Sequence, residues 1–408
     1  MRMERFEVHV ADDVLEDLRR RIGASRWPPT ADGLSWGYGF DWAYLRDLAE
    51  SWRDDFDWRA VERQINGFAH YRTVIDDIPI HFIREPGRGP APIPLILTHG
   101  WPWTFWDMQK VIRPLADPAS YGGDPADAFD VIVPSLPGFA FSTPLPRAGI
   151  SSMVIADLWR TLMTDVLGYA RFAAAGADWG ARVTGQLGHK HADALYGVHT
   201  VNTTPLDLFN AERYWDITGY LVPYNTPPEI RARVLPGLSR IVSHVAVQTV
   251  EPQTLAYAMH DSPVGMLAWL MQRRRDWGET GGDLESAFSR EHLLATATIY
   301  WATESFASAA RIYAEAIHQR WTPSHDRKPV IQAPAGITFL GGENPPGIDT
   351  PEQRIALFKA SPAAGNYDLR FVNAHARGGH FAHYENPDAC IADIRATFRK
   401  LRPIPGAD

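Results

Sequence analysis

Short apolar runs recur along this chain, and most of them end in a turn that precedes a segment with helical spacing of apolar residues. The runs are four to six residues long, which is typical of strands that are buried on both faces. They cover residues 93–97, 129–134, 171–175, 196–201, 336–340 and 369–372. Strands that alternate with helices indicate βαβ units. We therefore predict an α/β fold with a mostly parallel central sheet and helices on both faces.

The segments that lack this alternation of strands and helices predict an arm and a lid. Residues 12–22 and 44–52 have helical spacing, and residues 73–83 alternate like a strand pair about a turn at Asp76-Asp77. A later stretch is mostly helical in pattern, with proline-rich joints. We predict an N-terminal arm that wraps the core (1–80), a first core part (81–204), a helical lid (205–329) and a second core part (330–408).

Composition narrows the class of protein. Hydrophobic residues make up 45% and charged residues 22% of the 408, which is ordinary for a soluble globular chain. The net charge of −8 argues against a nucleic-acid partner, because phosphate binding needs a basic surface. The run Arg273-Arg274-Arg275 is then interpreted as the solvated end of a lid helix. Cys390 is the one cysteine, so no intrachain disulfide can form. No segment has the pattern of a signal peptide or a membrane span, so we expect a cytoplasmic protein without a membrane anchor.

The most informative motif is Gly176-Ala177-Asp178-Trp179-Gly180. It follows the apolar run 171–175 and precedes a helical segment at 181–187. This pattern on a strand-to-helix turn is typical of the nucleophile elbow of the α/β-hydrolase fold, here with Asp where most members have Ser. A carboxylate can attack an sp³ carbon and leave an alkyl ester on the enzyme, so the expected electrophile is an epoxide or an alkyl halide. An Asp that only caps the following helix is the alternative.

Hydrolysis of an alkyl ester on Asp178 needs a general base that activates water. His380 follows the last predicted strand, which places it at the carboxyl edge of the sheet, near the elbow. Glu343 follows the preceding strand and is the predicted acid that fixes the His380 tautomer. The order Asp178, Glu343, His380 is the nucleophile–acid–base order of this fold.

Two sets of residues have spacings like those of metal ligands. They are His189 with His191, and His380 with His383 and Glu385. No third partner is evident for either set in the sequence, and the reaction has no need of a metal ion. We therefore expect no metal and no cofactor.

The oxyanion that forms during ester hydrolysis needs hydrogen-bond donors. We predict the backbone N–H of Trp179, directly after the nucleophile, and that of Trp101 in the turn His99-Gly100-Trp101-Pro102. Aromatic residues cluster near these motifs and suit the walls of an apolar pocket. The predicted substrate-binding residues are Trp103, Trp106, Trp269 and Trp301.

Taken together, these motifs resemble those of epoxide hydrolases of the microsomal and juvenile-hormone type. The resemblance covers nearly the whole chain and implies an α/β-hydrolase fold with an N-terminal arm and a helical lid. The motifs that carry it are Arg26-Trp27-Pro28, Trp58-Arg59 through Ile80-His81-Phe82, His99-Gly100-Trp101-Pro102, Ser135-Leu136-Pro137-Gly138-Phe139, the elbow, Asp261-Ser262-Pro263-Val264-Gly265, Ile299-Tyr300-Trp301 and Arg377-Gly378-Gly379-His380-Phe381. Haloalkane dehalogenases share the Asp elbow but lack this arm. Membrane-bound relatives have an N-terminal anchor, so this sequence is similar to a soluble bacterial-type member.

The resemblance also implies that two lid tyrosines donate hydrogen bonds to the epoxide oxygen. Tyr313, in Arg311-Ile312-Tyr313, matches one of them, but the position of the other carries Ser243-His244. His244 is one substitute donor, and it would work best protonated. Another lid tyrosine is the second option, and a site that has drifted away from ordinary epoxides is the third. The candidate tyrosines are Tyr220, Tyr224 and Tyr257.

Two further positions depart from the family pattern. Trp103-Thr104 stands where relatives often have Gly-Ser, and a Trp there would narrow the pocket beside the nucleophile. The segment after Glu343 is longer than usual, which leaves Asp349 as an alternative acid.

The sequence therefore predicts a cofactor-free epoxide hydrolase that converts a bulky apolar or aromatic epoxide to a vicinal diol. The expected partners are a small-molecule epoxide and water, and the oligomeric state is open, with a homodimer as one option. Three other functions are compatible with the motifs. They are a biosynthetic enzyme that opens an epoxide with a different nucleophile, a haloalkane dehalogenase, and a non-catalytic protein that binds an apolar ligand.

Overall fold

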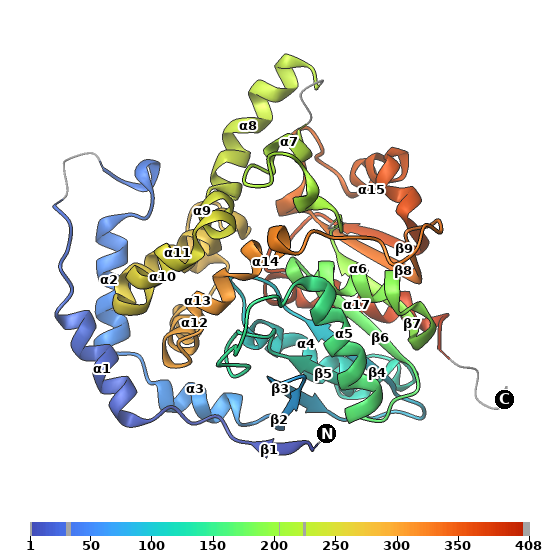
Figure 1. Cartoon of the computed structure of the whole chain (residues 1–408), viewed down its shortest axis with the longest axis horizontal. Helices are drawn as coiled ribbons and strands as arrows, with labels where there is room; N and C mark the ends of the chain where they lie inside the picture. The colour runs from blue at the N-terminus through green and yellow to red at the C-terminus, as the bar shows by residue number, and fades with distance from the viewer. Residues whose placement is uncertain (1, 30–33, 204, 223–225, 403–408) are drawn as a thin grey trace.

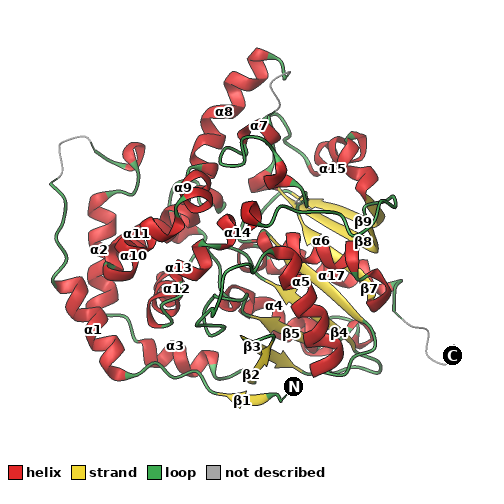
Figure 2. Ribbon diagram, viewed as in Figure 1, coloured by secondary structure: helices red, strands yellow, loops and turns green. Residues whose placement is uncertain are grey.

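A computed structural model describes residues 2–29, 34–203, 205–222 and 226–402. Its described residues form a nine-stranded sheet in the order β1-β2-β3-β5-β4-β6-β7-β8-β9 (Figures 1 and 2). The strands are β1 Glu4–Phe6, β2 His70–Ile75, β3 Ile78–Glu85, β4 Ile93–Thr98, β5 Phe129–Pro134, β6 Phe172–Ala177, β7 Leu195–Val201, β8 Ile331–Leu340 and β9 Tyr367–His375. From β5 to β9 all neighbouring strands are parallel, whereas β1, β2, β3 and β5 pair antiparallel. This confirms the predicted mostly parallel α/β sheet.

Helices cover both faces of the sheet. Successive residues of a strand point to opposite faces, and β7 shows the two layers directly. Val198 lies against Gly188 of α6, whereas a side chain at the neighbouring Gly197 would meet Phe398 of α17. Helices α5 and α6 contact each other on the first face, and α4 and α17 contact each other on the second. Their bounds are α4 Gln109–Ala116, α5 Ser152–Thr161, α6 Trp179–Lys190 and α17 Pro387–Arg399, and α15 (Pro351–Ala360) packs on β9.

The N-terminal segment wraps the side of the molecule, as Figure 1 shows in blue. It contains α1 (Asp12–Gly23), α2 (Trp42–Asp54) and α3 (Trp58–Ile65), and it joins the sheet through β1. The helices predicted at 12–22 and 44–52 and the hairpin about Asp76-Asp77 are present. Sequence analysis did not predict β1 or α3, and the arm boundary at residue 80 falls inside β3, because the arm and the core share one hairpin.

Helices between β7 and β8 form a layer above the carboxyl edge of the sheet (Figure 1). They are α7 Thr218–Leu221, α8 Pro228–Val242, α9 Val245–Val250, α10 Pro252–Asp261, α11 Pro263–Trp277, α12 Arg290–Ala302, α13 Phe306–Ala310 and α14 Ile312–His318. We call this segment the lid, and it lies within the predicted range 205–329. Arm and lid are joined by a buried hydrogen bond of 2.8 Å, which Trp52 Nε1 donates to Thr298 Oγ1.

The arginine run at the end of α11 corrects one expectation. Arg273 and Arg274 are only 6% and 0% exposed, so this is not the solvated end of a lid helix. Helix α11 contacts α1, α2, α8, α10 and α12, which leaves it no broad face toward water. Within the described part of the chain, no helix is both long and apolar enough to cross a membrane.

Candidate active site

Asp178 lies on a sharp turn between β6 and α6. Its backbone has φ 54° and ψ −125°, a region that side-chain-bearing residues rarely adopt, and such strain is typical of functional positions. The turn is possible because two glycines flank it. A side chain at Gly180 would overlap the Thr98 carbonyl of β4, and one at Gly176 would overlap the Gly180 carbonyl. The Asp178 side chain does not cap α6, so the helix-cap alternative does not describe this residue.

The turn after β4 donates a hydrogen bond to the Asp178 carboxylate. The backbone N–H of Trp101 lies 2.7 Å from Asp178 Oδ1, and Gly100 has no room for a Cβ beside that carboxylate. His99 holds the turn in place. Leu136 N–H donates to His99 Nε2 (3.1 Å), so the ring proton is on Nδ1, which donates to the Gly100 carbonyl (2.9 Å). Burial lowers the pKa of His99 to about 4, so this arrangement persists at neutral pH.

His380 lies between two carboxylates. Its Nδ1 is 2.7 Å from Glu343 Oε1, and its Nε2 is 3.5 Å from Asp178 Oδ2. Asn202, at the end of β7, donates its side-chain N–H to the other Glu343 oxygen. Asp349, the alternative acid, is exposed on the surface, and its backbone N–H is bonded to Gln353. Of the two candidate acids, Glu343 is therefore the one that contacts His380.

The charges around His380 set its protonation state. Burial opposes the charged form, but the charges of Glu343 and Asp178 and their hydrogen bonds outweigh it and raise the pKa of His380 to about 10. At neutral pH the resting site therefore holds an imidazolium. His380 becomes a base only if one of the two negative charges is removed.

The backbone of the His380 loop is held by two carboxylates that sequence analysis did not assign to the site. Glu385 accepts hydrogen bonds from the N–H groups of Glu279 (2.6 Å), Phe381 (2.8 Å) and Gly379 (3.2 Å). Glu279 in turn accepts one from Gly378 N–H (2.7 Å). The sequence signal for Glu385 was its spacing from His380, which indicated a metal ligand rather than a backbone acceptor.

The residues with metal-like spacing have other partners. His189 accepts a hydrogen bond from Ser324 N–H (2.8 Å) through Nε2, and its Nδ1 lies 2.8 Å from the Val330 carbonyl. His191 contacts Asp157 (2.7 Å). His383 is fully buried, which lowers its pKa to about 3. Among the described residues, no cluster of three or more His, Cys, Asp or Glu side chains could hold a metal ion.

Tyr313 of α14 and His244, between α8 and α9, face the nucleophile from the lid. Tyr313 Oη lies 2.8 Å from His244 Nε2, and both residues line the same cavity as Asp178 and His380. The imidazole of His244 stacks on the Trp101 ring with centroids 5.1 Å apart, and Tyr313 lies edge-on to Trp179 at 4.9 Å. The structure therefore brings the two predicted donors together above the carboxylate.

The surroundings of His244 disfavour the protonated form, in which it would donate best. Burial lowers its pKa well below the ordinary value, and the charges of Arg273 and His380 lower it further. His244 is thus a neutral imidazole at neutral pH. Of the alternative donors, Tyr257 is 72% exposed on the lid surface, whereas Tyr224 and the side chain of Tyr220 lie outside the described residues.

A cavity of about 590 Å³ opens above Asp178. Its polar end holds Asp178, His380, Glu343, Tyr313 and His244. The apolar wall includes Leu208, Phe209, Val234, Leu238, Ile241 and Val245, together with Trp179 and Trp277. This is the size range of pockets that take small organic ligands.

The predicted substrate-binding tryptophans do not line this cavity. Trp103 is buried beneath the His380 loop, where its ring lies 5.3 Å from that of Phe381. Trp106 packs in the core against Phe68, and Trp269 donates to Gln248 behind the cavity wall. The expectation failed because closeness to a motif in the sequence does not show whether a side chain points into the cavity or into the core.

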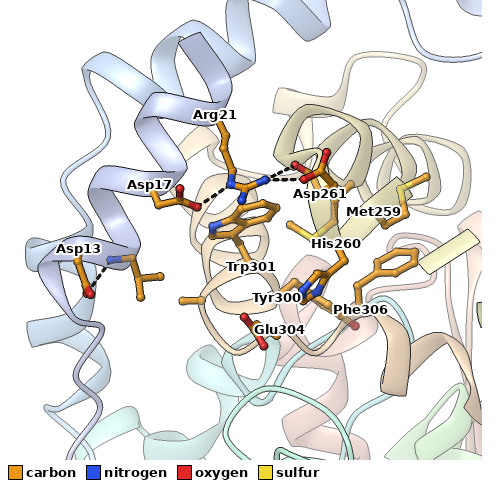
Figure 3. Close-up of a pocket in the computed structure, with 13 residues that line it drawn as sticks. Asp13, Asp17, Arg21, Met259, His260, Asp261, Tyr300, Trp301, Glu304 and Phe306 are labelled. Atoms are coloured by element: carbon orange, nitrogen blue, oxygen red, sulfur yellow. Dashed lines mark hydrogen bonds and ion pairs between the residues drawn. The ribbon is translucent and has the colours of Figure 1, made fainter. Parts of the chain in front are cut away.

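Trp301 lines a different cavity, of about 290 Å³, between α1 and helices α10 and α12 (Figure 3). The Arg21 guanidinium lies over its ring and donates to Asp17 (2.6 Å) and Asp261 (2.7 Å). Asp261 is the last residue of α10, so its ion pair with Arg21 of α1 joins the arm to the lid.

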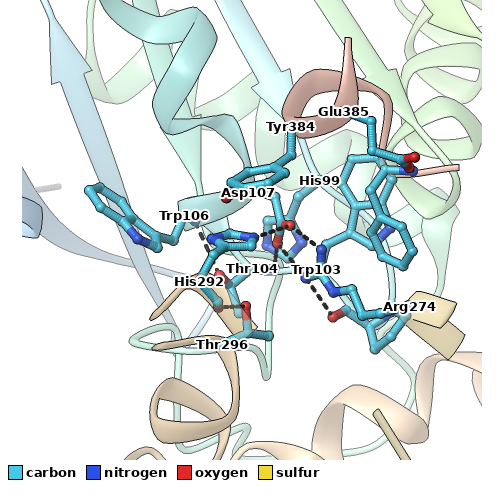
Figure 4. A network of polar contacts seen from close by, with 12 residues as sticks. His99, Trp103, Thr104, Trp106, Asp107, Arg274, His292, Thr296, Tyr384 and Glu385 are labelled. Carbon is cyan, nitrogen blue, oxygen red and sulfur yellow. Dashed lines mark hydrogen bonds and ion pairs between the residues drawn. The ribbon is translucent and has the colours of Figure 1, made fainter. Parts of the chain in front are cut away.

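A buried ion pair connects the lid to the Trp101 turn (Figure 4). Asp107 and Arg274 are both fully buried and joined by two hydrogen bonds, of 2.5 and 3.0 Å. Asp107 also accepts from Thr104 N–H (2.8 Å) and contacts His292 Nε2 (3.1 Å), and Arg274 reaches the Pro102 carbonyl (3.4 Å). Burial alone would raise the pKa of Asp107, but the Arg274 charge overrides it and keeps that pKa well below its usual range.

The mostly parallel sheet with a carboxylate on a strand-to-helix elbow, beside a histidine that contacts a glutamate, defines the fold as that of the α/β hydrolases. The family model "alpha/beta hydrolase fold" matches residues 93–305, and "Epoxide hydrolase N terminus" matches residues 3–108. The chain belongs to the epoxide hydrolase family.

Known relatives align with almost the full chain. A Stigmatella aurantiaca protein, provisionally named an epoxide hydrolase, is 36% identical over 97% of this chain and 85% of its own length. Epoxide hydrolase 1 of Oryctolagus cuniculus is 30% identical over 95% of this chain and 87% of its own. The solved structure of Aspergillus niger epoxide hydrolase matches with a TM-score of 0.75 at 26% identity, covering 98% of this chain and 97% of that one.

The Asp107–Arg274 pair generates a prediction about stability. We expect D107A to lower the free energy of unfolding by about 3–5 kcal/mol, because Arg274 is left buried without its counterion. Urea unfolding followed by tryptophan fluorescence measures the change.

The matched control removes the exposed pair between Arg46 and Glu50. E50A should change the free energy of unfolding by less than about 1 kcal/mol. Equal losses in D107A and E50A would contradict a dominant role for the buried pair.

Proposed function

We propose that this protein hydrolyses a bulky, largely apolar epoxide to a vicinal diol through a covalent ester on Asp178. One observation carries the proposal. The Asp178 carboxylate lies between the Trp101 N–H and His380 on the sheet side, and the Tyr313–His244 pair faces it from the lid. Nucleophile, base and proton donor thus surround one apolar cavity.

In the first step a carboxylate oxygen of Asp178 attacks an epoxide carbon, and the carbon–oxygen bond of the ring breaks. Oδ1 is engaged by Trp101 N–H, so Oδ2, on the His380 side, is the proposed nucleophilic atom. The departing oxygen would be a bare alkoxide without a donor. Tyr313 supplies the proton. We assign the ring proton of the neutral His244 to Nε2, because Nδ1 has no hydrogen-bond partner among the described residues, so that Nε2–H donates to the tyrosine oxygen and leaves the Tyr313 hydroxyl free to face the substrate.

Ester formation is also proposed to switch His380 into a base. Alkylation of Asp178 removes one of the two negative charges that raise the pKa of His380, so this pKa falls. The imidazolium then gives up its proton to solvent, and the neutral His380 takes a proton from water, which attacks the ester carbonyl. The N–H groups of Trp101 and Trp179 stabilise the oxyanion; Trp179 begins α6, so its N–H has no intrahelical acceptor. The diol leaves with Asp178 ionised and His380 protonated again, and Tyr313 recovers its proton from solvent, to which His380 had released one.

The donor pair also favours an epoxide over an alkyl halide. A halide leaves as a weakly basic anion that needs no proton, whereas an epoxide oxygen needs one. Two proton-bearing side chains opposite the nucleophile therefore suit an oxygen leaving group. The apolar wall of the cavity suits a hydrocarbon-rich substrate.

The covalent step gives the first test of this function. H380Q should form the ester on Asp178 but hydrolyse it slowly, because the base is missing. Intact-mass spectrometry after incubation with styrene-type, terpene and polycyclic epoxides should show a mass increase equal to the epoxide. D178N/H380Q is the control, and an adduct of equal yield in that variant would refute Asp178 as the nucleophile.

The proton donor gives a second test. Y313F should lower the rate of ester formation by about 10²–10³-fold, since a donor to the developing oxyanion is lost. Stopped-flow tryptophan fluorescence under single-turnover conditions measures this rate. Y257F changes an exposed lid tyrosine and should leave the rate unchanged. Equal rates in both variants would show that ring opening does not use Tyr313.

The protonation switch predicts a pH dependence. Hydrolysis of the ester should speed up as pH rises toward the His380 pKa, because neutral imidazole is the base. In E343Q a charge that raises this pKa is gone, so the midpoint should move to lower pH. D349N, at the exposed alternative acid, should keep the wild-type midpoint. An unmoved midpoint in E343Q would contradict the switch.

A further inference from the structure

The three consecutive arginines at the end of α11 have three different environments. Arg275 stacks on Trp36 of the arm at 4.1 Å and donates to the Gly282 carbonyl. Arg274 forms the buried pair with Asp107. Arg273 contacts Ser243 and Trp269 of the lid and takes part in neither of these interactions.

Arg273 is a buried cation that forms no direct ion pair among the described residues, although the charge of Asp276, one turn further along α11, acts on it. It is 6% exposed, its Nη1 donates to Ser243 Oγ (3.1 Å), and its guanidinium lies over the Trp269 ring at 4.9 Å. Within the described ranges it forms no ion pair with a carboxylate, and its Nε has no hydrogen-bond partner. Arginine keeps its charge in such surroundings, so burying it in this way destabilises the fold.

Arg273 lies next to the segment that carries His244, which contacts Tyr313. Ser243, which holds its Nη1, directly precedes His244, whose Nε2 is bonded to Tyr313. The Arg273 charge lowers the pKa of His244 and opposes the rise that burial and Asp178 cause in the pKa of Tyr313. The other charged or titratable groups that act on His244 are His380, from the catalytic loop, and Tyr313 itself.

We propose that Arg273 is a positioning residue for ring opening, a buried cation that acts through the His244–Tyr313 pair to stabilise the negative charge of the epoxide oxygen. This inference rests on the proposed function. Ring opening moves negative charge from Asp178, at the sheet, to the oxygen beneath the lid. Arg273 is the buried cation on the receiving side, and its charge adds to the effect of burial that keeps His244 neutral.

The first experiment measures ester formation under single-turnover conditions in the H380Q background. R273Q should slow this step by about 10–100-fold, less than the loss of a direct donor. R273K should recover most of the rate because it restores the charge. R240Q is the control, since Arg240 is an exposed lid arginine close to Ser243 whose charge is screened by water. A wild-type rate in folded R273Q would overturn the proposal.

A double-mutant cycle separates this role from simple packing. If Arg273 acts through Tyr313, the R273Q effect should largely vanish in the Y313F background, because coupled residues are not additive. Additive losses in Y313F/R273Q would show that Arg273 acts by another route. If R273Q does not fold, S243A, which removes the hydrogen bond to Nη1, should slow ester formation in the same direction, and an unchanged rate in S243A would count against the proposal.

The last measurement does not require an epoxide. NMR titration of ¹³C-labelled histidines, with H244Q to assign the signal, should show a higher His244 pKa in R273Q than in wild type and no change in R240Q. An unchanged His244 pKa in R273Q would refute the electrostatic action of Arg273. If no epoxide alkylates wild-type Asp178, the proposed function fails, whereas the NMR result still decides whether Arg273 acts on His244.

Discussion

The hydrogen bond from Trp101 N–H to the Asp178 carboxylate is the contact on which the site depends. It joins the ends of β4 and β6, which are neighbours in the parallel sheet, and it forms only because Gly100 and Gly180 let the two turns meet. The strained backbone at Asp178 is held by this meeting of two rigid strand ends. A larger residue at either glycine would separate the Asp178 carboxylate from the Trp101 N–H.

Positively charged groups lie on both the sheet side and the lid side of the cavity. At the sheet, the imidazolium of His380 lies between Glu343 and Asp178. At the lid, the Tyr313–His244 pair has the buried cation Arg273 behind it. A reaction that moves negative charge from the sheet toward the lid meets a positive group at each end, and the wall between them is apolar, which strengthens both interactions.

The lid is attached to the rest of the molecule by polar contacts at several points. Arg274 anchors α11 to Asp107 beneath the Trp101 turn, Arg21 joins α1 to the end of α10, and Trp52 joins α2 to α12. The arm therefore supports the lid, which carries Tyr313 and His244 to the cavity that Asp178 also lines. The described side chains of helix α8 are all at least partly exposed, although Val234, Leu238 and Ile241 line the cavity.

The sequence by itself determined the parallel strands, the elbow and the order of Asp178, Glu343 and His380. Apolar runs and the glycines of a sharp turn are visible in a few consecutive residues, and the order of the three groups is read directly along the chain. It also placed Tyr313 and His244 as candidate donors by their distance from lid motifs. Only the tertiary structure decided that His244 is neutral, that Arg273 and Arg274 are buried, and that Trp277 rather than Trp103 lines the cavity. Protonation and burial depend on which helices pack against one another, and a helical pattern that is apolar on more than one face does not specify its neighbours.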